Sequence, residues 1–124
     1  MNTGEILMYQ NQDGNIKIDV RLEEETVWLT QAQICELFQK SKATISEHIT
    51  NVFVEGELQP LTTVRKFRTV QQEGTRQVER EIEYYNLDVT ISVGYRVKSQ
   101  QGTQFRIWAT QRLKEYIIKG FALK

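Results

Sequence analysis

The chain has 124 residues, 40% of them hydrophobic and 26% charged, a composition typical of one soluble domain around a single hydrophobic core. The net charge is zero, but it is −6 on residues 1–63 (four Lys/Arg and ten Asp/Glu) and +6 on residues 64–124 (twelve Lys/Arg and six Asp/Glu). Either the second half attracts a polyanion, or the asymmetry is compositional scatter. No hydrophobic run has the length of a membrane span, and no signal peptide opens the chain. Cys35 is the only cysteine, which excludes an internal disulfide. We therefore expect a cytoplasmic protein.

A β-hairpin is predicted at the N-terminus. Residues 5–10 and 16–22 are rich in hydrophobic side chains, and Asp13-Gly14 between them favours a tight turn because glycine adopts positive φ readily. In the second strand hydrophobic and polar residues alternate, which indicates that one face is buried. Residues 23–26 are a predicted turn, and the three residues after it could pair as a further strand.

Two short helices are predicted over residues 30–56. Thr30 and Ser41 are residue types that cap helix N-termini, and Gly56 is of the type on which helices commonly end. Between these residues hydrophobic side chains recur at helical spacing, which predicts that the helices pack on each other and on a core. The hydrophobic positions are Ile34, Leu37 and Phe38 in the first helix and Ile45, Ile49, Val52 and Phe53 in the second.

The spacing of this helix pair is that of a helix-turn-helix. The motif needs a small residue where the helices cross, here Cys35, and a polar, exposed start of the second helix. The turn departs from the usual pattern: Gln39-Lys40 replaces a glycine and a hydrophobic residue, and a non-glycine residue at positive φ costs about 1 kcal/mol, so the turn could be built differently. The alternative is a helix pair that only packs. If the pair binds DNA, the expected contacts are Lys42, Ala43, Ser46 and Glu47 in the major groove, with Ser41 and Thr44 near phosphates.

A second hairpin is predicted over residues 64–85, because residues 64–70 and 78–84 favour strands and Glu73-Gly74 lies between them. A hairpin after a helix-turn-helix is the layout of a winged helix, in which the wing contacts the DNA backbone. The alternative is a solvated hairpin, since four glutamates partly cancel the charge of its cations. These cations are Arg65, Lys66, Arg68, Arg76 and Arg80, of which we select Arg76 and Arg80 as DNA contacts.

Two helices are predicted over residues 86–120. Asn86 would cap a short hydrophobic helix, although its β-branched residues leave a strand as the rival interpretation. After a loop, "KSQQG", Thr103 would cap a long helix that ends at Gly120. The hydrophobic residues of this helix do not form one narrow stripe, which favours a homodimer with the helix as its seam. The residues that could not easily all face inward are Phe105, Trp108, Tyr116 and Ile117.

No catalytic residue, metal site or cofactor is predicted. The single histidine, His48, is more simply explained as a packed helix residue than as a ligand, and no Cys/His spacing indicates zinc. Gly94 and Gly102 are too far apart for a nucleotide-binding motif. We therefore expect no enzyme, no small-molecule cofactor and no membrane partner. The expected core joins both halves through Trp28, Phe38, Phe53, Phe105 and Trp108.

The chain resembles the virulence protein RhuM family of bacteria. The resemblance rests on "EILMYQNQDGNIKIDVRLEEETVWLTQAQICELF", on the helical stretch that follows, and on "EGTRQVEREIEYYNLDVTISVGYRVKSQQGTQFRIWATQRLKEYIIKGFALK", in which "GYRVKSQQGTQFRIWATQRLKEY" is highly specific. It extends over almost all of the chain and implies the N-terminal part of a longer, DNA-associated protein found in mobile elements and pathogenicity islands. It supplies no catalytic mechanism.

Together these features predict a single α+β domain over residues 1–124: a winged helix-turn-helix-like segment with two β-hairpins, followed by a C-terminal helical pair. Its regions are residues 1–29 (N-terminal β-hairpin), 30–56 (helix-turn-helix), 64–85 (wing) and 86–120 (C-terminal helices). The expected function is binding of double-stranded DNA, with a regulatory role. The alternative is a protein–protein interaction module, for dimerisation or for a toxin or phage protein, without direct DNA binding. Salt separates the two, because DNA binding weakens steeply with salt and a hydrophobic interface does not.

Overall fold

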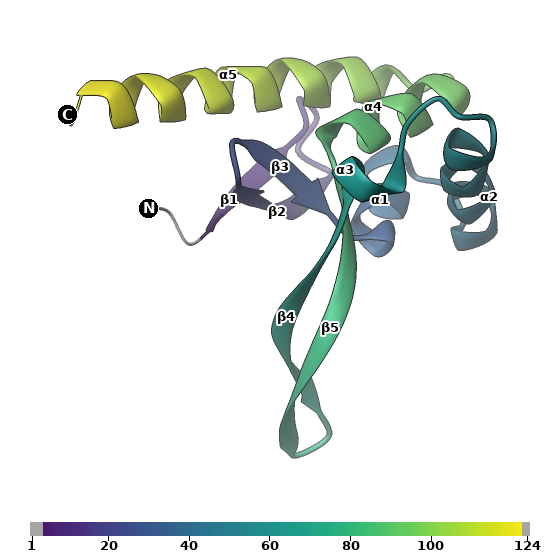
Figure 1. Ribbon diagram of the computed structural model, residues 1–124, viewed down its shortest axis with the longest axis horizontal. Helices are drawn as coiled ribbons and strands as arrows, with labels where there is room; N and C mark the ends of the chain where they lie inside the picture. The colour runs from purple at the N-terminus through teal and green to yellow at the C-terminus, as the bar shows by residue number, and fades with distance from the viewer. Residues whose placement is uncertain (1–3, 123–124) are drawn as a thin grey trace.

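The computed structural model describes residues 4–122 and has the predicted α+β class. One antiparallel sheet holds all the described strands, in the order β1 (Glu5–Gln10), β2 (Lys17–Glu23), β3 (Thr26–Leu29), β5 (Arg76–Asn86) and β4 (Val64–Glu73). The helices, among them α2 (Lys42–Val54) and α5 (Gln100–Ala122), pack around the part of the sheet away from the tip of β4 and β5. In Figure 1, α5 runs along the side of the molecule opposite to β4 and β5, which project away from the body as a long ribbon. The predicted DNA-reading helix α2 lies at one edge of the body, level with the base of this ribbon.

The N-terminal hairpin forms as predicted, from β1 (Glu5–Gln10) and β2 (Lys17–Glu23). Gly14 has φ of +77° at the turn, the conformation that glycine adopts without strain. The chain then turns through Glu24 and Glu25, both at positive φ, into β3 (Thr26–Leu29), which pairs with β2. The possible further strand is therefore confirmed.

The two helices after β3 begin at the predicted caps. Thr30 caps α1 (Gln31–Phe38) in a capping box with Gln33, and Ser41 caps α2 (Lys42–Val54) by accepting a hydrogen bond from the backbone of Thr44. The turn keeps its left-handed residue although it lacks glycine: Gln39 has φ 55° and ψ 49°. The Gln39 side chain donates to the Glu36 carbonyl at 2.7 Å, a local bond that helps to offset the strain of this conformation.

The second hairpin forms over residues 64–86, within one residue of the predicted range, and belongs to the same sheet as the first. It consists of β4 (Val64–Glu73) and β5 (Arg76–Asn86), and a short helix α3 (Pro60–Thr63), which the sequence did not predict, precedes it. The two hairpins meet where β3 pairs with β5. The sequence pattern predicted both hairpins but not this connection.

The C-terminal region is helical, as expected, with different boundaries. Asn86 caps α4 (Leu87–Arg96), so the rival interpretation of a strand is wrong. The last helix, α5 (Gln100–Ala122), begins before Thr103 and continues past Gly120, which corrects both predicted ends. Part of the expected loop is thus helix, and the Ser99 hydroxyl accepts a hydrogen bond from the Gln101 backbone at this start.

The core lies between the sheet and the helices and includes side chains from both halves of the chain. Of the five predicted core aromatics, Phe38 and Phe105 are buried inside this cluster, whereas Phe53 and Trp108 are only partly buried at its margin. Trp28 is also buried, but on the other face of the sheet, where it contacts Phe67. Among the described residues no helix has both the length and the hydrophobicity needed to cross a membrane.

Candidate nucleic-acid interface

The N-terminal half of α2 is the exposed polar surface that the sequence predicted. Ile45, Ile49 and Val52 are buried and fix one side of the helix against the core. Their spacing turns the intervening residues outward. Ser41, Lys42, Ala43, Ser46 and Glu47 are exposed, and Thr44 is half-buried.

The first turn of α2 presents backbone donors and one cation. No acidic residue lies in this turn, so its partial positive charge is not cancelled locally. The Ser41 hydroxyl is already engaged with Thr44, accepting from its backbone N–H at 3.2 Å and donating to its Oγ1 at 3.0 Å. Lys42 therefore carries the positive charge of this surface, while Glu47 places a carboxylate one turn further along.

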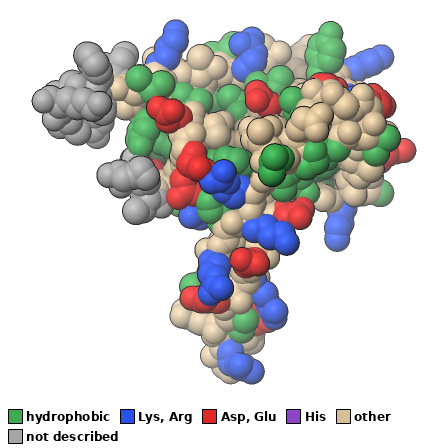
Figure 2. Space-filling view, viewed as in Figure 1, with side chains coloured by type: hydrophobic (Ala, Val, Ile, Leu, Met, Phe, Trp, Pro, Cys, Tyr) green, Lys and Arg blue, Asp and Glu red, His purple; other side chains and the backbone are tan. Residues whose placement is uncertain are grey.

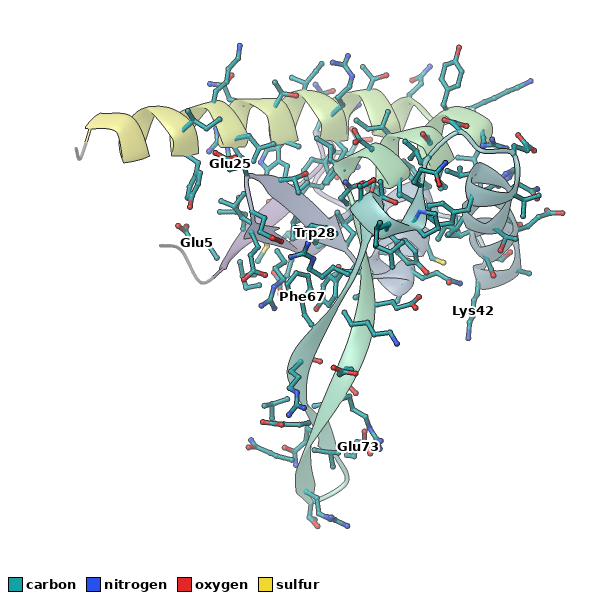
Figure 3. The ribbon with its side chains drawn as sticks, viewed as in Figure 1. Glu5, Glu25, Trp28, Lys42, Phe67 and Glu73 are labelled. Carbon is teal, nitrogen blue, oxygen red and sulfur yellow. The ribbon has the colours of Figure 1, made fainter. Side chains whose placement is uncertain are left out.

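A cleft of about 540 Å³ separates the starts of α1 and α2 from the base of β5. The long side chain of Lys42, the first residue of α2, extends toward the same side of the molecule as the wing, as Figure 3 shows. The β5 residues of the cleft could not be selected from the sequence, because only the folded sheet brings them near the start of α2. Its lining includes Gln31, Cys35, Lys42, Ile82, Glu83 and Tyr85.

Glu83 is the acidic group of this cleft and is bonded to Tyr85. The Tyr85 hydroxyl donates to the Glu83 carboxylate at 3.2 Å. Burial, together with the neighbouring Glu83 charge, raises the pKa of Tyr85 to about 12, so the phenol remains a protonated donor at neutral pH. The Glu83 carboxylate lines the same cleft as Lys42 and opposes any phosphate that approaches it.

The wing carries alternating charges, visible as neighbouring blue and red groups on the projecting ribbon in Figure 2. Three of its arginines are held by carboxylates: Arg65 by Glu24, Arg68 by Glu79 at 3.2 Å, and Arg80 by Glu73 through two hydrogen bonds of 2.9 Å. The Arg80 guanidinium holds the pKa of the Glu73 carboxyl below its usual range. Of the two predicted wing contacts, Arg80 is thus already paired.

Arg76 is exposed next to the wing turn and forms no ion pair with any of the side chains that the structure describes, those of residues 4–117. Lys66 on β4 likewise has no carboxylate within ion-pair distance in this part of the chain. These two cations are more available for an anionic partner than Arg68 or Arg80. The sequence could not show which of these four cations are paired with a carboxylate, because the pairing depends on how the strands align.

Cys35 and His48 are the two residues for which the sequence raised the question of a catalytic or metal-binding role. Burial raises the pKa of the Cys35 thiol, which leaves it a weak nucleophile at neutral pH. His48 is half-buried on α2. Within the described part of the chain no three His, Cys, Asp or Glu side chains are grouped closely enough to hold a metal ion.

The comparison with known proteins gives one match. The model of a family described as "Virulence protein RhuM family" matches residues 62–124, which include the wing, α4 and α5. The match begins after α2, so the helix pair lies outside it. No curated protein and no solved structure matches the chain.

Proposed function

The chain belongs to the virulence protein RhuM family, and from this membership together with the geometry above we propose that it binds double-stranded DNA. In this proposal α1 and α2 act as a helix-turn-helix, with α2 as the reading helix, and β4 and β5 act as a wing. The observation that carries the proposal is the exposed, polar start of α2 on the same side of the molecule as the projecting ribbon. A convex helix end beside a ribbon suits a groove and its flanking backbone.

Each selected residue has a defined role in the proposal. Lys42 and Ser46 read base edges, Ala43 allows close approach, and Glu47 accepts a hydrogen bond from a cytosine amino group. The backbone at Ser41 and Thr44 lies near a phosphate, because helix N-termini attract anions. On the wing, Arg76 contacts the backbone, and Arg80 does so only after leaving Glu73.

A single copy should bind weakly and with strong salt dependence. The cations without ion pairs on the turn, α2 and the wing, within the described chain, are Lys40, Lys42, Lys66 and Arg76. If all four contact phosphates, the slope of log K against log salt is roughly −3 to −4, equivalent to about a 100-fold loss of affinity between 50 and 200 mM salt. Glu47 and Glu83 reduce the affinity further.

Fluorescence anisotropy with labelled mixed genomic fragments, measured across this salt range, tests the proposal. Lys42→Ala should weaken binding and reduce the salt slope by roughly one. Lys114→Ala is the matched control, since Lys114 is exposed on α5, on the side of the body away from the wing. If binding is independent of salt, or if the two variants behave alike, α2 is not the reading helix.

We also propose that two copies act together, with α5 between them. Of the four α5 residues that the sequence suggested could not all face inward, Phe105 is buried, Trp108 and Tyr116 are partly buried against the core, and Ile117 is left exposed. The remaining support is Ile107 and Ile117, which are 59% and 53% exposed on the same helix. This surface is also what favours an interaction module as the second candidate function. Sedimentation at micromolar concentration should detect a dimer that Ile107→Arg disrupts, and a monomer at all concentrations would contradict the proposal.

A further inference from the structure

The wing joins the rest of the sheet over a short distance. β3 pairs with β5 only at Trp28–Asn86 and Leu29–Tyr85, and β4 lies at the edge of the sheet. Beyond this junction the ribbon continues as two strands, from Arg65–Tyr84 to Glu73–Arg76. A two-stranded ribbon is marginally stable alone and free to bend, so its direction must be fixed by contacts at its base.

Aromatic rings and an arginine supply these contacts on the sheet face away from the core. The group consists of Arg21, Trp28, Phe67 and Tyr84, which we call the Phe67 cluster, and Figure 3 shows Trp28 and Phe67 at the base of the wing. Phe67 meets Trp28 edge-on, with ring centroids 5.7 Å apart, and meets Tyr84 in the same manner at 5.2 Å. The Arg21 guanidinium lies 4.1 Å from the Phe67 centroid.

The body side of the cluster is firmly held. Trp28 is 3% exposed, and its ring nitrogen donates to the Glu23 carbonyl at 2.9 Å. Arg21 donates to the Glu23 carboxylate at 3.2 Å. Phe67 is therefore a wing residue inserted among fixed groups of β2 and β3, and a second link, the ion pair of Arg65 with Glu24, lies beside it.

We propose that the Phe67 cluster sets the direction in which the wing projects, and that Phe67 and Arg21 are positioning residues for DNA binding. They contact no DNA in this arrangement; they hold the wing at one angle to α2. A wing that samples many directions must be ordered at every binding event, which lowers affinity without removing a contact. The inference rests on the proposed function and extends it to residues outside the DNA-facing surface.

The wing direction can be measured without DNA. Spin labels are attached at Gln72→Cys on the wing and Thr50→Cys on α2, in a Cys35→Ala background; both labelled positions are exposed. Double electron–electron resonance then gives the distribution of distances between the two labels. Phe67→Ala should broaden the distribution, and Phe67→Tyr, which keeps the ring, should restore it. Val70→Ala is the matched control, because Val70 is a wing residue that is 62% exposed and lies beyond the cluster.

The same variants are then titrated with the labelled genomic fragments. Phe67→Ala should bind about tenfold more weakly with an unchanged salt slope, since no phosphate contact is lost, and Phe67→Tyr should recover the affinity. Arg21→Lys, which keeps the charge but loses the flat stacked group, should fall between them. Circular dichroism of each variant at the assay temperature ensures that folded proteins are compared.

The outcomes separate the two proposals. An unchanged distance distribution in Phe67→Ala overturns the inference, and so does a broadened distribution with unchanged DNA affinity. If the unsubstituted protein and every variant fail to bind DNA, the proposed function fails and the role in DNA binding fails with it. In that case the distance measurement alone still decides whether the cluster holds the wing.

Discussion

Gly94→Ala should destabilise the protein, because α4 and α5 cross with almost no space between them. Gly94 is buried in α4, and a Cβ added there would lie 2.7 Å from Cζ and 3.0 Å from Cε1 of Phe38. It would also lie 3.4 Å from the Cα of Gly102 on α5. Phe38 is only 3% exposed, so its ring cannot move out of the way into solvent.

Two effects of opposite sign determine how much Gly94→Ala changes the free energy of unfolding. Alanine is favoured over glycine inside a helix by about 1 kcal/mol. Overpacking of a tight core costs about 1–3 kcal/mol, and a contact of 2.7 Å to a confined ring belongs to the upper part of this range. We expect a net loss of about 1–2 kcal/mol in the free energy of unfolding, which lowers the melting temperature by roughly 5 °C per kcal/mol.

Gly102→Ala is the matched comparison on the other side of the same crossing. Its added Cβ would lie 3.6 Å from the Cα of Gly94 and 3.6 Å from Cε1 of Phe38, which is ordinary van der Waals contact. Helix propensity then dominates, so this variant should be neutral or more stable by up to about 1 kcal/mol. Urea denaturation followed by circular dichroism measures both. A Gly94→Ala protein as stable as Gly102→Ala would refute the packing argument.

Three further predictions concern charges. Glu83→Gln removes the carboxylate of the cleft and should raise DNA affinity about threefold at low salt in the anisotropy assay; weaker binding would mean that Glu83 makes a needed contact. Arg76→Ala should weaken DNA binding more than Arg80→Ala, because Glu73 already holds Arg80, and equal losses would argue against this difference. Arg96 donates hydrogen bonds to Glu55 and Glu57. It lowers the pKa of the Glu55 carboxyl, and hydrogen bonds from Ser92 and then Arg96 lower the pKa of the Glu57 carboxyl in the folded state. The folded protein thus binds fewer protons than the unfolded chain, so this contribution is present at neutral pH and is lost as the pH falls through the carboxyl range. Arg96→Gln should therefore lose more stability at pH 7 than at pH 3, measured by denaturation at both.

Local signals in the sequence were sufficient to place most helix starts. Thr30, Ser41 and Asn86 cap α1, α2 and α4 because a short polar side chain satisfies a free backbone donor wherever a helix begins. The sequence did not predict the start of α5, because it depends on how α5 packs against α4. Gly102 reads as a loop residue in the sequence, but it lies inside a helix at the close crossing with Gly94.

The candidate site was predictable on α2 and much less so on the wing. The outward residues of α2 follow from the helical spacing of Ile45 and Ile49. In contrast, the pairing of Arg80 with Glu73, the position of Glu83 in the same cleft as Lys42 and the contacts of Phe67 all depend on how strands align and meet. The pattern of a single strand indicates which of its faces is buried, but not which other strand it meets or which side chains then lie opposite one another.

The junction of β3 with β5 also has a consequence for the order in which the protein folds. Leu29 and Tyr85 pair across 56 positions of sequence, and α1, α2 and β4 all lie in the intervening chain. Each hairpin can close rapidly by itself, whereas this junction requires closure of a long loop and is therefore the slow, late step. Until it forms, α2 and the ribbon belong to separate, fluctuating pieces of chain. The two surfaces proposed to bind DNA therefore reach their relative positions in the same folding step. In a partly folded chain α2 and the ribbon are not yet held at a fixed position relative to each other.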